Sequence, residues 1–169
     1  GLTPDDFKYI ILSHTHFDHT GTANAFKNAT WLVQQAEYDF VTSDETKTNN
    51  PDAFNAIKEL TNVKKLNGDH DVFGDGSIII KSMPGHTPGH QVLFIDLVDQ
   101  GPVMLSGDLY HFSENRIHMR VPSFNFDPGK TIESMKAFEA FVEEKNAKVY
   151  LQHELTDFNK MPKAPEYLK

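Results

Sequence analysis

The chain has 169 residues and carries 24 acidic against 16 basic side chains, which gives a net charge of −8. This charge opposes binding to nucleic acid, because a basic face is normally required to contact the phosphate backbone. No apolar run is long enough to cross a bilayer, so we expect a soluble protein without a membrane partner. Cysteine is absent, which excludes disulfides and thiolate ligands but does not separate cytoplasm from periplasm.

Short apolar runs separated by polar breaks divide the first part of the chain. Residues 9–12 (YIIL) are β-branched and apolar, which predicts a strand. Residues 43–50 (SDETKTNN) are polar throughout, and we expect a loop there. Pro51 suits the first turn of a following helix. The elements expected before residue 62 are strands at 9–12 and 30–33 and helices at 20–29, 35–42 and 51–60.

From Val63 onward the pattern changes to strands separated by glycine-bearing turns. Asp127-Pro128 then indicates a helix start, and apolar residues recur at three- and four-residue steps as far as Lys145. A mixed α/β fold in a single domain over residues 1–169 follows from this order of elements. The strands expected in this part are 63–66, 71–73, 77–83, 91–97, 102–105 and 148–151.

Residues 14–19 read HTHFDH and follow directly after the first predicted strand. Four metal-ligating side chains stand within these six residues. Imidazole nitrogens and carboxylate oxygens suit borderline divalent metals such as zinc, and a carboxylate can bridge two ions. The motif therefore predicts a binuclear metal site, with four candidate ligands: His14, His16, Asp18 and His19.

Three further polar segments also stand at the ends of predicted strands: PGH at 84–86, SGD at 106–108 and QH at 152–153. Loops at the rim of a sheet can converge on one site, because the hydrogen-bonded strands hold them at fixed spacing. The added candidate ligands are His86, Asp108 and His153. We expect His90 to support a ligand rather than to bind metal. The histidines not expected to be ligands are His70, His111 and His118.

HTHFDH, PGHTPGH at 84–90, SGD at 106–108 and the late His153 together resemble the metallo-β-lactamase-fold hydrolases. HTHFDHTGTANAF, VQQAEYD at 33–39, PGHTPGHQ and GDLYHF at 107–112 are most similar to N-acyl homoserine lactonases, the quorum-quenching enzymes. The resemblance implies a metallo-β-lactamase-like αββα sandwich. It also implies a bacterial, metal-dependent hydrolase that opens the ring of a small-molecule lactone with a hydroxide bridging two metals.

The resemblance also assigns roles to the candidate ligands. It implies that one divalent ion is held by His14, His16 and His86 and the other by Asp18, His19 and His153, with Asp108 between them. Zinc is the first expectation, although the same nitrogen and oxygen ligands accept iron, manganese or cobalt. Asp18 would move the proton of the attacking water to the leaving ring oxygen.

A hydroxyl donor to the oxyanion is also expected, and Tyr110 is the candidate. In the best-known lactonases this tyrosine lies three positions after the bridging aspartate. That position is His111 here, one residue after Tyr110. Phe112, Met119, Phe124 and Phe126 line a channel for an acyl chain in one interpretation and belong to the core in the other.

The fold normally places several strands before the first histidine pair, whereas thirteen residues precede His14 here. We therefore expect a partial domain that lacks its first strands. A second copy or another partner chain would cover the exposed sheet. Two alternatives to a lactonase stay open: a β-lactamase or other ester or thioester hydrolase of the same fold, and a truncated, noncatalytic metal-binding module.

Overall fold

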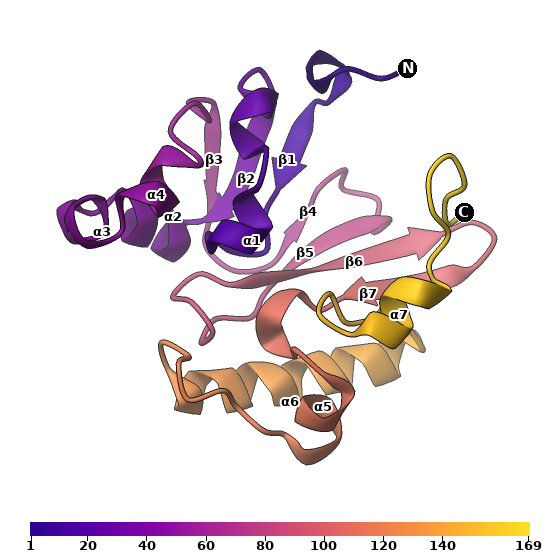
Figure 1. Cartoon of the computed structure of the whole chain (residues 1–169). Coiled ribbons are helices and arrows are strands. Elements are labelled where there is room, and N and C mark those ends of the chain that lie inside the picture. Colours follow the sequence, from indigo (N-terminus) through magenta and orange to yellow (C-terminus); the bar gives the residue numbers. More distant parts are fainter. The chain divides into compact units, whose positions relative to one another are not determined.

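The computed structural model describes residues 1–169, and its contacts divide the chain into two compact units, residues 1–68 and 69–169. Figure 1 shows the elements in chain order. No helix in the structure combines the length and the apolar character that a membrane span requires. Each unit is built around one sheet with its own buried core.

The first unit contains a three-stranded parallel sheet in the order β1-β2-β3. Trp31 and Val33 alternate along β2 onto one face, where they pack with Val41 and Leu60 in the core of this unit. The strands are β1 (Tyr9–Ile11), β2 (Thr30–Gln34) and β3 (Val63–Leu66). The helices are α1 (Phe17–Thr20), α2 (Gln35–Thr42), α3 (Asp44–Asn49) and α4 (Pro51–Asn55), with 3-10 turns η1 (Pro4–Asp6) and η2 (Ala23–Phe26).

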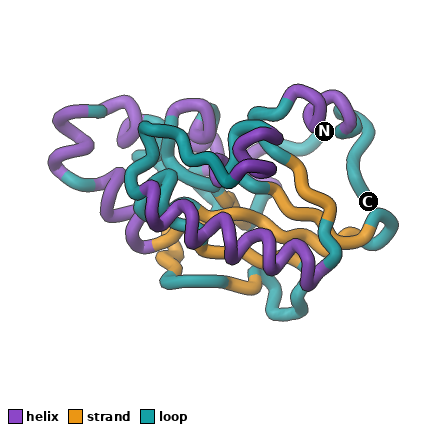
Figure 2. Tube along the Cα trace, turned by 90° about the horizontal axis from the view of Figure 1, so that it is seen from below, coloured by secondary structure: helices purple, strands orange, loops and turns teal.

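The second unit contains a five-stranded sheet in the order β4-β5-β6-β7-β8, antiparallel except for the parallel pair β7-β8. Phe94 and Met104 are directly paired across β6 and β7, and both lie in one core cluster with Met135 and Phe138 of α6. Figure 2 shows the long helix α6 lying across the strands. The strands are β4 (His70–Asp71), β5 (Ile78–Ser82), β6 (Gln91–Leu97), β7 (Gly101–Leu105) and β8 (Lys148–Tyr150). The helices are η3 (Gly107–Leu109), α5 (Ser113–His118), α6 (Pro128–Lys145) and α7 (Leu155–Lys160).

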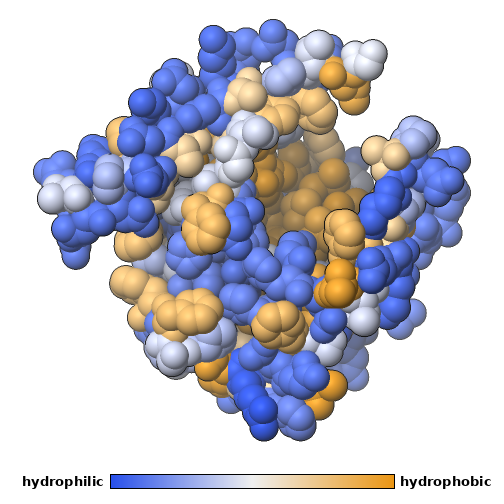
Figure 3. All heavy atoms as spheres, in the orientation of Figure 1, coloured by the Kyte–Doolittle hydropathy of each residue, from blue (hydrophilic) through white to orange (hydrophobic).

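The predicted strands and the long helix are confirmed, with shifts of one or two residues at their ends. The loop predicted at residues 43–50 is wrong, because residues 44–49 form α3. The Ser43 hydroxyl accepts a hydrogen bond from the Thr46 N–H, and Asp44 and Glu45 lie in the first turn, where the helix dipole favours negative charge. Figure 3 shows a mainly hydrophilic surface over this helix.

Candidate metal centre

In the first unit, the imidazole rings that follow β1 lie close together. The ring centroid of His14 lies 4.5 Å from that of His16 and 4.1 Å from that of His19. The Asp18 carboxylate lies 3.6 Å from His19 Nε2. The Ser13 hydroxyl is 3.1 Å from Nδ1 of both His14 and His19. The four predicted ligands of this motif are thus neighbours, and Ser13 orients two of the rings.

A buried carboxylate from α2 holds this loop in place. Glu37 Oε1 accepts hydrogen bonds from the Thr15 backbone N–H at 2.8 Å and from the Thr15 hydroxyl at 2.7 Å. Glu37 is 1% exposed, so these bonds lie away from competing water. Thr15 stands between His14 and His16, and Glu37 therefore positions both imidazoles. No local sequence pattern points to Glu37, because it stands 22 residues from Thr15.

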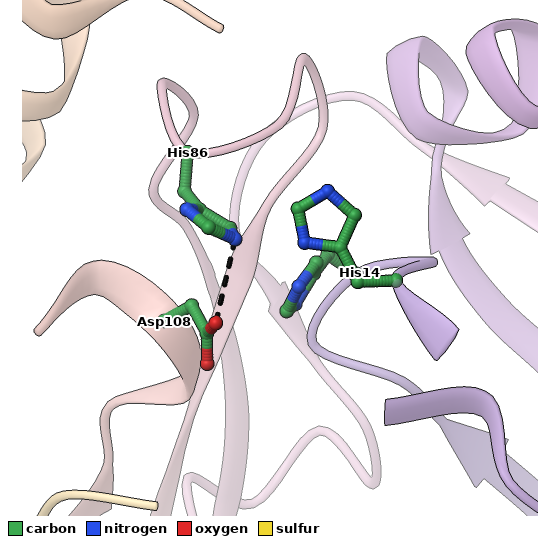
Figure 4. A group of neighbouring side chains, drawn as sticks. His14, His86 and Asp108 are labelled. Carbon is green, nitrogen blue, oxygen red and sulfur yellow. Dashed lines mark ion pairs between the residues drawn. The ribbon is translucent and has the colours of Figure 1, made fainter. Parts of the chain in front are cut away.

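In the second unit, three imidazoles approach one buried carboxylate. Asp108 lies in η3, directly after β7. Its Oδ2 is 3.4 Å from His86 Nε2 and 3.2 Å from His111 Nε2, and its Oδ1 is 3.2 Å from His153 Nε2. Figure 4 shows the His86 ring facing the Asp108 carboxylate. Of these residues, His86, Asp108 and His153 stand after β5, β7 and β8 as their motifs predicted, whereas His111 was not expected among the ligands.

Hydrogen bonds behind His86 determine which nitrogen carries its proton. The Thr131 hydroxyl donates to the Asp127 carbonyl oxygen and accepts from Asn125 Nδ2 at 3.1 Å. Asn125 Oδ1 is therefore the acceptor at 3.0 Å from His86 Nδ1, so Nδ1 donates. In the neutral imidazole the Nε2 lone pair then faces Asp108 Oδ2. A proton or a metal ion between the two atoms satisfies this pair, and its nitrogen and oxygen donors fit a divalent metal.

The His86 loop is held against the start of α6. The carbonyl of His86 accepts from the Phe126 N–H at 3.1 Å, and that of Gly85 accepts from the Asp127 N–H at 2.9 Å. Gly85 has a φ of +134°, and a Cβ added there would lie 2.4 Å from the Thr131 backbone nitrogen. Only glycine allows this close approach of the loop to the helix.

His90 supports Asp108 through its backbone. His90 Nε2 accepts a hydrogen bond from the Asp108 N–H at 3.0 Å, and its Nδ1 lies 3.0 Å from the Met83 carbonyl oxygen. Both ring nitrogens are thus used by the protein backbone, which leaves neither for a metal. This placement agrees with the supporting role expected for His90.

Tyr110 does not join the ligands. Its side chain is fully buried in the core, where its ring packs edge-on against Phe138 and its hydroxyl donates to the Met135 carbonyl oxygen at 3.4 Å. Burial, reinforced by the Glu139 carboxylate, raises the pKa of Tyr110 above its ordinary value. A core hydroxyl directed at a helix carbonyl is not placed to stabilise an oxyanion. The placement of its side chain does not support the role predicted for Tyr110, which stays a prediction.

The chain belongs to the metallo-beta-lactamase superfamily, whose sequence profile matches residues 1–153. It is 33% identical over 168 residues to N-acyl homoserine lactonase AiiA of Bacillus thuringiensis subsp. kurstaki, an alignment that covers 99% of this chain and 64% of the relative. It is 32% identical over 179 residues to N-acyl homoserine lactonase AttM of Rhizobium radiobacter, with 99% and 65% covered. The chain thus spans less than two thirds of the length of these relatives.

A solved structure supports the same fold. An N-acyl homoserine lactone hydrolase with the product N-hexanoyl-L-homoserine at its catalytic metal center matches with a TM-score of 0.83 at 33% identity. The match covers 99% of this chain and 64% of that chain. The predicted α/β fold of the metallo-β-lactamase type is confirmed.

Proposed function

We propose that this protein is a metal-dependent hydrolase that opens the lactone ring of N-acyl homoserine lactones or related lactones. The observation that carries the proposal is the His86–Asp108 pair, whose two facing acceptors fit a cation. The chain belongs to the metallo-beta-lactamase superfamily, and the similar relatives named above are N-acyl homoserine lactonases.

The proposed centre holds two divalent ions, with zinc as the first expectation. The nitrogen and oxygen donors of both units match the ligand preferences of zinc, and cysteine is absent. The second unit supplies a carboxylate that contacts imidazoles through both of its oxygens, which suits a bridging ligand. The proposed ligands are His14, His16, Asp18, His19, His86, Asp108 and His153.

Bound divalent ions supply an acidified water and a polarised lactone carbonyl at neutral pH. The residues of the chain then orient the substrate and move protons. Asp18 is the proposed proton carrier: its carboxylate takes a proton from the attacking water and delivers it to the ring oxygen as the ester bond breaks. Its side chain is 36% exposed, which leaves it accessible to a substrate from solvent.

Phe124 is the proposed apolar wall for the acyl chain. Its ring lies edge-on at 5.5 Å from the His111 ring and 6.0 Å from the His86 ring, measured between centroids. Phe124 is 67% exposed, so it is not a core residue. An exposed aromatic side chain next to the proposed ligands suits contact with a hydrocarbon chain.

The test is hydrolysis by the zinc-loaded protein of three substrate classes: an N-acyl homoserine lactone, a β-lactam and a thioester. We expect turnover of the lactone to exceed turnover of the other two, and removal of metal with a chelator to abolish it. A matched pair of variants separates ligand from surface histidine: His86→Ala should lose turnover, whereas exposed His118→Ala should keep it. Turnover of the β-lactam and not of the lactone would contradict the lactonase proposal and indicate a β-lactamase. Metal binding without turnover would favour a noncatalytic module.

A further inference from the structure

We propose that His111 is a metal ligand, completing a three-residue set with Asp108 and His153 inside the second unit. The inference rests on the metal centre proposed above but not on the lactone substrate. Sequence reasoning left His111 outside the ligands, because it is separated by two residues from the SGD motif and no pattern marks it.

The backbone explains why His111, and not Tyr110, reaches Asp108. Tyr110 follows η3 in an extended conformation, with φ −136° and ψ 127°. Successive side chains of an extended segment point to opposite sides. Tyr110 enters the core beside Phe138, and His111 consequently points to the carboxylate.

The distances between the imidazole nitrogens and the Asp108 oxygens match those between two ligand atoms on one zinc ion. His111 Nε2 and His153 Nε2 each lie 3.2 Å from an oxygen of Asp108. One ligand atom from each of the three residues lies within 4.8 Å of the other two. Two ligands at zinc–ligand distances of about 2.0–2.1 Å in a tetrahedral site lie about 3.3 Å apart. Each contact to Asp108, at 3.2 Å, is thus close to the distance between two ligand atoms in such a site.

The two imidazoles are also arranged in parallel. The His111 and His153 rings are stacked with 5.3 Å between their centroids and 16° between their planes. Each ring presents its Nε2 to the same carboxylate, His111 to Oδ2 and His153 to Oδ1. The His111 side chain is 15% exposed, and its buried Nδ1 has no hydrogen-bond partner in the protein. The contact of Nε2 with Asp108 is therefore the polar contact that orients the His111 ring.

A zinc-loaded crystal of the whole chain tests the proposal, with the ions located by anomalous scattering. We expect His111 Nε2 within about 2.3 Å of an ion. An ion on Asp108 and His153, with His111 Nε2 more than about 3 Å away, would overturn the role of His111 and leave the metal centre intact. Absence of any ion would overturn both proposals.

Competition with a chelator gives an independent readout in solution. His111→Phe keeps a ring that can stack on His153 but removes the donor nitrogen. It should lower the affinity of the more weakly held zinc ion at least tenfold, whereas the matched change at an exposed position, His118→Phe, should leave it within twofold. Equal affinities in the wild type and His111→Phe would contradict the proposal even if the variant folds normally.

Discussion

The hydrogen bond between His86 Nδ1 and Asn125 determines which ring nitrogen faces Asp108. Its Nδ1 donates to Asn125, so the other nitrogen presents a lone pair to a carboxylate 3.4 Å away. Two buried acceptors that face each other are costly unless a proton or a metal ion lies between them. The residue pair therefore indicates a cation more strongly than the motif PGH alone.

Glu37 should act on metal binding without being a ligand. Glu37→Ala removes the acceptor of two Thr15 hydrogen bonds between the first two histidines. We expect zinc affinity to fall about 10- to 100-fold, the usual effect of losing such support, and the free energy of unfolding to fall by about 1–3 kcal/mol. Chelator competition and denaturant titration measure the two effects. An unchanged zinc affinity would show that the loop holds its shape without Glu37.

Tyr110→Phe should retain lactone turnover within about twofold, because the hydroxyl contacts the Met135 carbonyl and not the ligands. Losing this long hydrogen bond and the weak contact to Met119 Sδ at 3.9 Å should cost about 1 kcal/mol of unfolding free energy or less. Steady-state kinetics on the zinc-loaded variant measure the effect on turnover. A loss of turnover with full metal content would restore Tyr110 to the mechanism.

The candidate ligands were predictable because each follows a strand in a recognisable motif. The directions of the Tyr110 and His111 side chains were not predictable, because they depend on how the chain leaves η3. This turn of three residues determines which of the two side chains enters the core. No spacing in the sequence indicates which one it is.

At the scale of elements, the close contact between the His86 loop and α6 can be tested by comparing the stabilities of two glycine variants. Gly85→Ala would place a methyl group 2.4 Å from backbone and side-chain atoms of Thr131, at a φ of +134°. We expect a loss of about 3 kcal/mol or more of unfolding free energy, from overpacking and backbone strain together. Gly129→Ala is the matched control, since its Cβ would meet only Asp127 Oδ1 at 3.4 Å. Equal stabilities of the two variants by denaturant titration would contradict the close approach.

The ion pair between α5 and α6 should make stability depend on pH. Arg116 contacts Glu139 through two nitrogens at 2.9 and 2.8 Å. Burial acts to raise the pKa of Glu139, but the hydrogen bonds and charge of Arg116 bring it below its ordinary value. The stabilisation is therefore complete above the unfolded-state pKa near 4.5 and is lost as pH falls through the lower folded-state pKa.

Glu139→Gln should remove this dependence. We expect about 1 kcal/mol lower unfolding free energy than wild type at pH 7, as for partly exposed pairs, and a smaller difference at pH 3. Urea titrations at the two pH values measure it. A difference that grows toward low pH would show the opposite sign and contradict the assignment.

The strands and the long helix α6 were predictable from the pattern of apolar residues, and the short polar helices were not. In α6 the predicted apolar positions Met135 and Phe138 are fully buried. Helices α3, α5 and α7 have six residues each and few apolar side chains. Their ends depend on local caps, such as Ser43 before α3 and Glu154 before α7, which apolar periodicity does not detect.

At the scale of the whole molecule, the proposed ligands are divided between the two units. The first unit contributes His14, His16, Asp18 and His19, and the second contributes His86, Asp108 and His153. The sequence profile of the superfamily runs across both units, from residue 1 to residue 153. The expectation of a single domain over residues 1–169 stays a prediction.

Metal stoichiometry tests the central claim most directly. The metal-free chain is titrated with zinc in a calorimeter, and the bound metal is then measured by elemental analysis after gel filtration. We expect two zinc ions per wild-type chain, and one or none in a variant that carries His14→Ala and His86→Ala together. One ion per wild-type chain at saturating zinc would contradict the two-ion centre, and no bound ion would contradict the proposed hydrolase as well.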